Sequence, residues 1–196
     1  MNEELILKAM ELFDTPEKWN AFNELASKRN ALFGRWWKKL QTKVFQIERN
    51  EMPDDWDIDC FWDTNFRWYI KGDKPQSLCI HFFIPNNEIM RLRVFYGFGA
   101  LDQNKVSELY QSKFSVINSC FDRLDNSSPD TIGMEYGNYT FGSIYDGNFP
   151  DNYTLSWYAG NRTEDFANQI IAKVRKFQTP EITALFKEIN EKCRKG

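Results

Sequence analysis

The chain has 196 residues and a mass of 23.3 kDa, which suffices for one large hydrophobic core and predicts a single domain over residues 1–196. Its 25 basic and 28 acidic side chains leave a formal net charge of −3. That balance excludes a wholly electrostatic hold on nucleic acid or on an anionic membrane but allows a local basic face. A composition that is 42% hydrophobic and 16% aromatic excludes an intrinsically disordered chain.

The first 50 residues or so predict an N-terminal helical segment. Apolar residues recur at helical spacing over residues 3–13, and a proline at position 16 follows an N-cap signal. A long amphipathic helix is therefore predicted from Pro16 to Arg49, with room for a break near Gly34. Arg29 falls in the apolar sector of that helix, which predicts a buried guanidinium paired with a carboxylate.

After this segment the hydrophobic pattern changes from helical to alternating. Alternation over residues 58–70, 78–84 and 90–96, with turn residues at 71–75 and 85–87, predicts three strands in an antiparallel meander. Asp102 is the expected N-cap of a helix that reaches Leu124.

Aromatic segments over residues 132–145 and 153–157 predict two further strands, and closing helices are expected to begin at Thr163 and Pro180. The predicted class is α+β: a mostly antiparallel sheet of about five strands with helices packed on it, in the order ααβββαββαα. One shared core is expected from the apolar sides of these elements. Its predicted members are Ile58, Leu78, Ile80, Phe82, Leu92, Val94, Ile117 and Phe121.

A basic stripe on the long predicted helix is the first candidate site. It consists of side chains within about 80° of arc and two flanking tryptophans: Lys28, Arg35, Lys39 and Lys43, with Trp36 and Trp37. Basic groups beside aromatic rings are typical of surfaces that bind nucleic acid. The alternative is a solvated helix face whose lysine stems shield the tryptophans.

Two carboxylates on the first predicted strand form a second candidate. Asp57 and Asp59 are two residues apart, so their side chains project from the same face about 7 Å apart. With Glu88 as a third ligand they would bind a magnesium ion in a divergent metal-dependent nuclease. The neighbouring strands lack the acid and lysine pair of PD-(D/E)XK nucleases, and a solvated strand face is the competing interpretation.

Histidine and cysteine restrict the remaining chemistry. The only histidine, His81, alternates onto the less apolar face of its strand beside Arg91 and Arg93, and we expect it to be structural rather than a general base. The four cysteines show no C-x-x-C spacing, so no zinc site and no cofactor are expected. Without a signal peptide or a run of about 18 apolar residues, we expect a cytoplasmic protein that contacts no membrane.

Four segments combine aromatic and helical positions: the Arg35-Trp36-Trp37 triplet, the strand 91–96, the helix 105–122 and the aromatic segment that ends in Trp157. Together they resemble a bacterial domain of unknown function that is often found at the C-terminus of restriction-endonuclease-like proteins. The resemblance extends from about Phe33 to Phe186 and implies no activity, because it rests on aromatic and helical positions. Met134-Glu135-Tyr136 stands where the family has a tryptophan, and the missing acid and lysine pair implies at best an inactive relative of PD-(D/E)XK enzymes.

Three classes of function follow from these observations. The first is a non-catalytic binding module, associated with nucleic acid as an accessory of a bacterial or phage defence system. The second is an acidic inhibitor or immunity-type protein that binds a partner protein through its aromatic residues. The third is the divergent nuclease. We expect the partner to be nucleic acid or a protein and assign no catalytic residue, and the sequence leaves the oligomeric state open.

Overall fold

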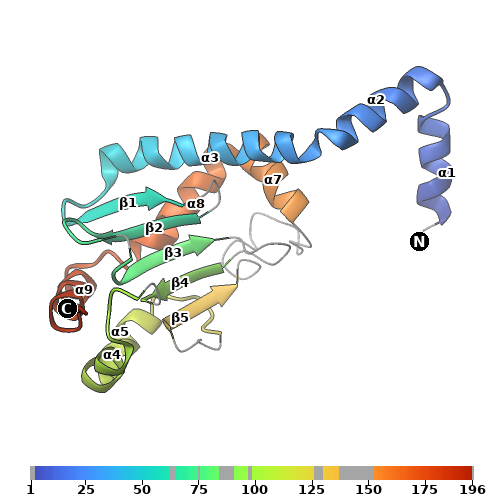
Figure 1. Ribbon diagram of the computed structural model, residues 1–196. Coiled ribbons are helices and arrows are strands. Elements are labelled where there is room, and N and C mark those ends of the chain that lie inside the picture. The colour runs from blue at the N-terminus through green and yellow to red at the C-terminus, as the bar shows by residue number, and fades with distance from the viewer. Residues whose placement is uncertain are drawn as a thin grey trace.

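A five-stranded antiparallel sheet organises the protein (Figure 1). The structure is a computed structural model and describes residues 3–61, 65–74, 76–83, 91–96, 99–125, 130–136 and 152–195. Its strands follow the chain in spatial order: β1 (Trp56–Cys60), β2 (Asn65–Ile70), β3 (Cys79–Phe83), β4 (Arg91–Phe95) and β5 (Thr131–Tyr136). The predicted α+β class, with an antiparallel sheet of about five strands, is confirmed.

Helices precede and follow the sheet. The N-terminal helices are α1 (Glu3–Leu12), α2 (Pro16–Ser27) and α3 (Arg29–Glu51). Between β4 and β5 lie α4 (Gln103–Tyr110), a 3₁₀ turn (Gln111–Lys113) and α5 (Phe114–Asn118). The C-terminal helices are α7 (Asn152–Asn161), α8 (Thr163–Arg175) and α9 (Pro180–Lys192). Three of these helices, α2, α4 and α9, begin at N-cap residues whose side chains accept hydrogen bonds from amides of the first turn. The hydroxyl of Thr15 accepts a hydrogen bond from the Lys18 amide, Asp102 caps α4, and Thr179 caps α9.

The long N-terminal helix breaks at Lys28 and not near Gly34. Lys28 leaves the helical conformation with ψ near 3°, while its amide still donates to the carbonyls of Glu24 and Leu25. Gly34 lies inside α3. The prediction that Arg29 is buried is wrong, because α2 and the first turns of α3 extend past the end of the sheet, where no core lies beneath the apolar sector (Figure 1).

Three strand and helix predictions are also corrected. Residues 58–70 form two strands in a hairpin, paired from Trp56 with Ile70 to Cys60 with Phe66, and the alternation simply continues through the reversal. Residues 153–157 lie in helix α7, and the helix predicted to reach Leu124 ends at Asn118. Of the segment predicted as a strand over 132–145, residues 132–136 belong to β5 and the others lie outside the described residues.

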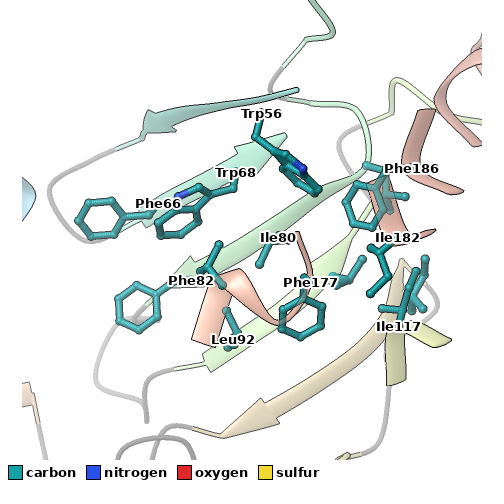
Figure 2. Close-up of a cluster of buried hydrophobic side chains, with 14 of the residues drawn as sticks. Trp56, Phe66, Trp68, Ile80, Phe82, Leu92, Ile117, Phe177, Ile182 and Phe186 are labelled. Carbon is teal, nitrogen blue, oxygen red and sulfur yellow. The ribbon is translucent and has the colours of Figure 1, made fainter. Parts of the chain in front are cut away.

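One hydrophobic core fills the space between one face of the sheet and the helices (Figure 2). Alternate residues of β1 to β4 point into it, and α8, α9 and α5 supply the opposing side chains. Seven of the eight predicted core residues are buried there, and the eighth, Ile58, is partly buried against them. Fully buried tryptophans and phenylalanines provide much of its volume: Trp56, Trp68, Phe66, Phe82, Phe166, Phe177 and Phe186.

A buried carboxylate joins α3 to this core. Glu48 is fully buried on the inner side of α3 and accepts a hydrogen bond from the indole of Trp68 on β2, with 2.7 Å between Nε1 and Oε1. Arg175 at the end of α8 donates to both Glu48 oxygens, at 3.2 and 2.5 Å. Glu48 therefore links α3, the sheet and α8 through one charged group.

Replacing Glu48 with alanine is expected to lower the free energy of unfolding by about 3 kcal/mol, because it leaves the Arg175 charge and the Trp68 indole without their acceptor. Glu48→Gln, which keeps one acceptor oxygen, is expected to lose less. Urea denaturation measures both, and Glu51→Ala, at an exposed position of the same helix, is the control. A Glu48→Ala protein as stable as Glu51→Ala would show that the buried ion pair contributes nothing.

Candidate functional site

The outward face of α3 concentrates positive charge. The helix carries two acidic side chains, Glu48 and Glu51, and six basic ones: Arg29, Arg35, Lys38, Lys39, Lys43 and Arg49. Its net charge is therefore +4, whereas the protein as a whole has −3, so the rest of the chain carries −7. Because Glu48 is turned inward and paired with Arg175, the outer surface of α3 is more basic than the helix total.

Four of the basic residues lie in an exposed row along one side of the helix. At 100° per residue, Arg35, Lys38, Lys39 and Arg49 lie within about 100° of arc, and all four are exposed. The polar residues Thr42 and Gln46 lie on the same side. We call these four side chains the α3 basic row. Lys38 and Arg49 were missed at the sequence level, although their spacing from Arg35, at i+3 and i+14, places them on one helix face.

Three of the four basic residues predicted from the sequence have partners within the protein. Lys28 lies at the α2–α3 junction, 2.6 Å from Glu24, and is separated from the basic row by almost two turns. Lys43 pairs with Glu164 of α8 at 3.0 Å. The Lys39 ammonium, which belongs to the row, donates to the carbonyl oxygen of Gly160 at 2.6 Å.

The two predicted tryptophans hold α7 against α3. Trp37 is buried, and its indole nitrogen donates to the Ser156 hydroxyl at 2.9 Å. Trp36 lies so close to Gly160 that a Cβ atom there would be 2.1 Å from the indole Cδ1. Both tryptophans therefore pack α7 against α3, a role that neither the nucleic-acid interpretation nor the solvated face with lysine stems over the tryptophans predicted.

Shallow hollows flank the α3 basic row on both sides. One of about 590 Å³ separates it from the α7–α8 junction and includes Lys39, Lys43 and Arg162. The other, about 410 Å³, includes Lys38, Phe45 and Arg49.

An aromatic residue that the sequence analysis assigned to a strand shares a helix face with a residue that lines the first hollow. Trp157 of α7 is 47% exposed. It is one turn before Asn161, which lines that hollow, and residues four apart share a helix face. The basic row is therefore accompanied by one accessible indole, although not by either of the two predicted ones.

The sheet face opposite the core carries a second group of charged residues. Asp59 of β1 receives three hydrogen bonds of 2.8 to 3.1 Å from the guanidinium of its cross-strand neighbour Arg67, which is buried. His81 of β3 lies beside Arg67 in the sheet and beside Arg93 of β4 on its other side. Arg93 Nε donates to His81 Nδ1 at 3.2 Å.

The electrostatics of this face keep His81 neutral. Burial, then the charges of Arg93 and Arg67, lower the pKa of His81 from 6.5 to about 2. Burial also lowers the pKa of Arg93 to about 10 and raises the pKa of the Cys79 thiol to about 12. A histidine that accepts from an arginine and has so low a pKa does not act as a general base near neutral pH, which agrees with the structural role expected for it.

Two of the three carboxylates predicted as metal ligands lie in the described part of the chain, and both have hydrogen-bond partners within the protein. Asp57 and Asp59 do lie on the same face of β1, opposite Tyr69 and Arg67. Asp59 is engaged by Arg67, and Asp57 Oδ1 accepts from the Ile58 amide at 2.8 Å. Glu88 lies outside the described residues. Within the described residues, no group of three or more His, Cys, Asp or Glu side chains is arranged to hold a metal ion.

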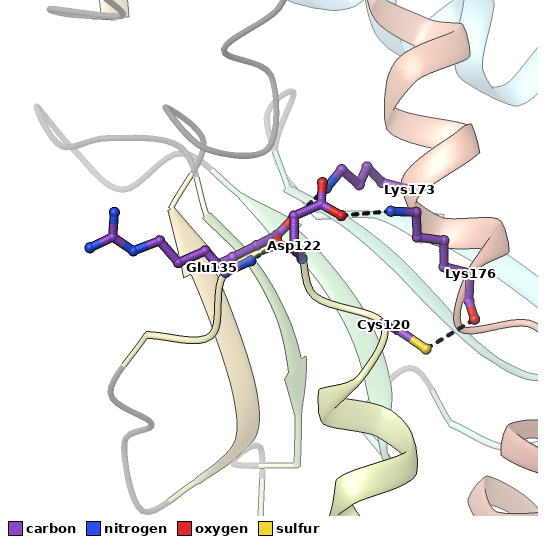
Figure 3. Close-up of polar contacts among 6 residues, drawn as sticks. Cys120, Asp122, Glu135, Lys173 and Lys176 are labelled. Atoms are coloured by element: carbon purple, nitrogen blue, oxygen red, sulfur yellow. Dashed lines mark hydrogen bonds and ion pairs between the residues drawn. The ribbon is translucent and has the colours of Figure 1, made fainter.

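A third charged cluster lies where β5 meets α8 (Figure 3). The fully buried Glu135 accepts from Lys173 Nζ at 3.2 Å and from the Asp122 amide at 2.8 Å. Asp122 pairs with both Lys173 and Lys176, and these two lysines lower the pKa of its carboxyl. The cluster ties the segment after α5 to α8, so the buried Glu135 has structural partners on both.

Comparison with known protein families, curated proteins and solved structures found no match. The resemblance to a restriction-endonuclease-associated domain therefore stays a prediction. No helix in the described part of the chain is long and apolar enough to cross a membrane.

The close contact between Trp36 and Gly160 leads to a paired prediction. Gly160→Ala is expected to destabilise the protein by about 1 to 3 kcal/mol, because the new methyl group overlaps the indole. Gly34→Ala, inside α3 with no atom near its Cβ position, is expected to stabilise it by about 0.5 to 1 kcal/mol. Thermal and urea unfolding measure both. Equal stabilities of the two variants would contradict the close packing of α7 on α3.

Because His81 is the only histidine, its effect on stability can be isolated. Below about pH 6.5 the unfolded chain binds a proton at His81 that the folded protein does not. The contribution of neutral His81 to the free energy of unfolding is therefore fully present above about pH 6.5 and is lost as the pH falls below that value. Between about pH 7.5 and pH 5, the wild type is expected to lose about 2 kcal/mol more than His81→Gln, measured by urea denaturation. Equal losses in the two proteins would mean that folded His81 titrates normally.

Proposed function

We propose that the protein is a non-catalytic module that binds nucleic acid along the outer face of α3. The observation that carries the proposal is the segregation of charge: one helix of net +4 in a chain whose remainder carries −7. Evenly mixed charges would serve solubility equally well. A one-sided basic helix in an acidic protein instead attracts a polyanion to one defined surface and repels it elsewhere.

The dimensions of the basic row support a phosphate backbone as the ligand. From Arg35 to Arg49 the helix rises about 21 Å, a length that spans several phosphates of one strand at about 3.4 Å spacing in a duplex. The hollows on both sides are shallow and lined largely by polar and charged residues, which suits an extended ligand better than a small molecule enclosed in an apolar pocket.

Trp157 favours a single strand over a duplex. A base that is not paired presents its face, and stacking on an exposed indole contributes about 1 to 3 kcal/mol per base. The basic row would then hold the backbone while Trp157 holds a base, a combination that carries little sequence specificity. A cytoplasmic location belongs to the same proposal, and the association with a defence system rests on the sequence resemblance alone.

Neutralising the basic row tests the proposal. Arg35→Gln, Lys38→Gln and Arg49→Gln together are expected to weaken binding of a short labelled single-stranded oligonucleotide at least tenfold. The salt dependence should also become shallower, by roughly two units in log K against log salt concentration. Fluorescence anisotropy over a salt series measures both.

The matched control removes the same three charges elsewhere. Lys71→Gln, Lys105→Gln and Lys195→Gln are all exposed and lie outside α3. If binding depended on net charge alone, both triple variants would lose the same affinity, and the proposed interface would be wrong. Absence of binding by the wild type at low salt would also overturn the proposal.

The role of Trp157 has its own readout. Trp157→Ala is expected to lower single-strand affinity by about 5- to 100-fold without changing the salt slope, because stacking releases no counterions. Trp157→Phe, which keeps an aromatic face, should retain most of the affinity. An unchanged affinity in Trp157→Ala would restrict the interface to the backbone contacts of α3.

A further inference from the structure

The N-terminal arm, residues 3–32, exposes an unusual amount of apolar surface. It comprises α1, α2 and the first turn of α3 and extends away from the sheet (Figure 1). Eight of the twelve large hydrophobic side chains that are exposed in the described part of the chain belong to it, with exposed fractions of 41 to 69%. They are Ile6, Leu7, Met10, Leu12, Trp19, Phe22, Leu25 and Leu32.

The arm has a defined shape but no core of its own. Phe13, Trp19 and Phe22 meet at the corner between α1 and α2, with ring centroids 4.5 to 6.0 Å apart. Neither helix has a buried residue among those whose side chains are described. Helices of 10 and 12 residues are marginal in water unless an apolar face is covered. Among the described residues, the arm therefore presents an apolar surface that a second molecule can cover.

The distribution of charge along the arm indicates which molecule. The outer part, residues 3–17, has five acidic side chains and one basic side chain, for a net charge of −4. The inner part, residues 18–32, has three basic side chains and one acidic side chain, for a net charge of +2. An arm that is acidic at its tip and basic at its base is complementary to itself when a second copy lies antiparallel to it.

We propose that the arm is a homodimerisation element that pairs antiparallel with the arm of a second copy. A two-fold axis between the arms places the acidic tip of each against the basic base of the other, so the same favourable contact forms twice. The apolar side chains of both copies then face each other. Eight such side chains per copy provide an area on the order of the ~800 Å² that each partner buries in a stable interface.

A membrane is a poorer fit to the same surface. Amphipathic helices that lie on membranes are rich in lysine and arginine on their polar face and attract anionic lipids. The outer part of this arm is acidic and would be repelled. The proposal is independent of nucleic-acid binding, since none of the four residues of the α3 basic row is among the eight apolar residues that would be covered.

Measuring the mass in solution gives the first test. Light scattering coupled to size exclusion, over a concentration series of the full chain, is expected to show twice the monomer mass of 23.3 kDa. Leu7→Glu with Leu25→Glu should give a monomer in which the sheet and its core unfold at an unchanged temperature. Leu109→Glu with Leu124→Glu, at positions exposed to a similar degree outside the arm, should remain dimeric.

Charge reversal gives the sharper test, because it depends on the antiparallel pairing. Glu3→Lys, Glu4→Lys and Glu11→Lys together change the net charge of residues 3–17 from −4 to +2, and Lys18→Glu with Lys28→Glu changes that of residues 18–32 from +2 to −2. Each variant alone then opposes like charges and is expected to be monomeric or at least tenfold weaker as a dimer, whereas an equimolar mixture should form a heterodimer.

The remaining outcomes would contradict the proposal. A wild type that stays monomeric at all concentrations overturns the proposal, and if that monomer sediments with anionic vesicles the arm is a membrane element instead. A wild-type dimer that survives Leu7→Glu with Leu25→Glu places the interface elsewhere and also overturns it. A mixture of the two charge variants that fails to associate rejects the antiparallel arrangement.

Discussion

The paired carboxylate of Glu48 sets the position of α3, on which both the core and the candidate interface depend. A buried charge is tolerated only when its partners are in place, and Glu48 meets Trp68 and Arg175 only when one side of α3 faces the sheet. The opposite side is then turned to solvent. Because Arg35 and Arg49 lie on that opposite side, the contact that docks the helix also orients the α3 basic row outward.

The sheet separates two environments of different polarity. One face is apolar and buries the tryptophans and phenylalanines of the core (Figure 2). The other carries ionisable groups that balance each other across strands, as Asp59 does for Arg67. Arg93 is placed over the rings of Phe95 and Phe83, with its Cζ atom 3.6 and 4.4 Å from their centroids. Ion pairing and cation–π contacts thus make a charged sheet face compatible with burial.

Local periodicity determined how much of the fold was predictable. Strands β3 and β4 and the buried side of α3 were predicted because one face of each packs on the core, and that face leaves its period in the sequence. Helix α7 was mistaken for a strand because its aromatic residues favour strands, whereas its fit depends on Gly160 accepting Trp36 from a distant helix. Arg29 was misjudged because a periodic apolar stripe does not say whether a core lies beneath it.

The candidate site was predictable to a similar extent and for the same reason. The basic helix was identified from its sequence, and Arg35 and Lys39 are exposed as the pattern suggested, but the pattern did not distinguish tryptophans that dock a helix from one that faces solvent. Which tryptophan packs against another helix depends on tertiary contacts that the local sequence does not encode. The two proposals meet in α3, whose inner end is fixed to the sheet by Glu48 while its outer end continues into the arm. A dimer joined through the arms would hold two basic rows at a fixed separation, so one strand long enough to reach both would bind with an avidity that neither row has alone.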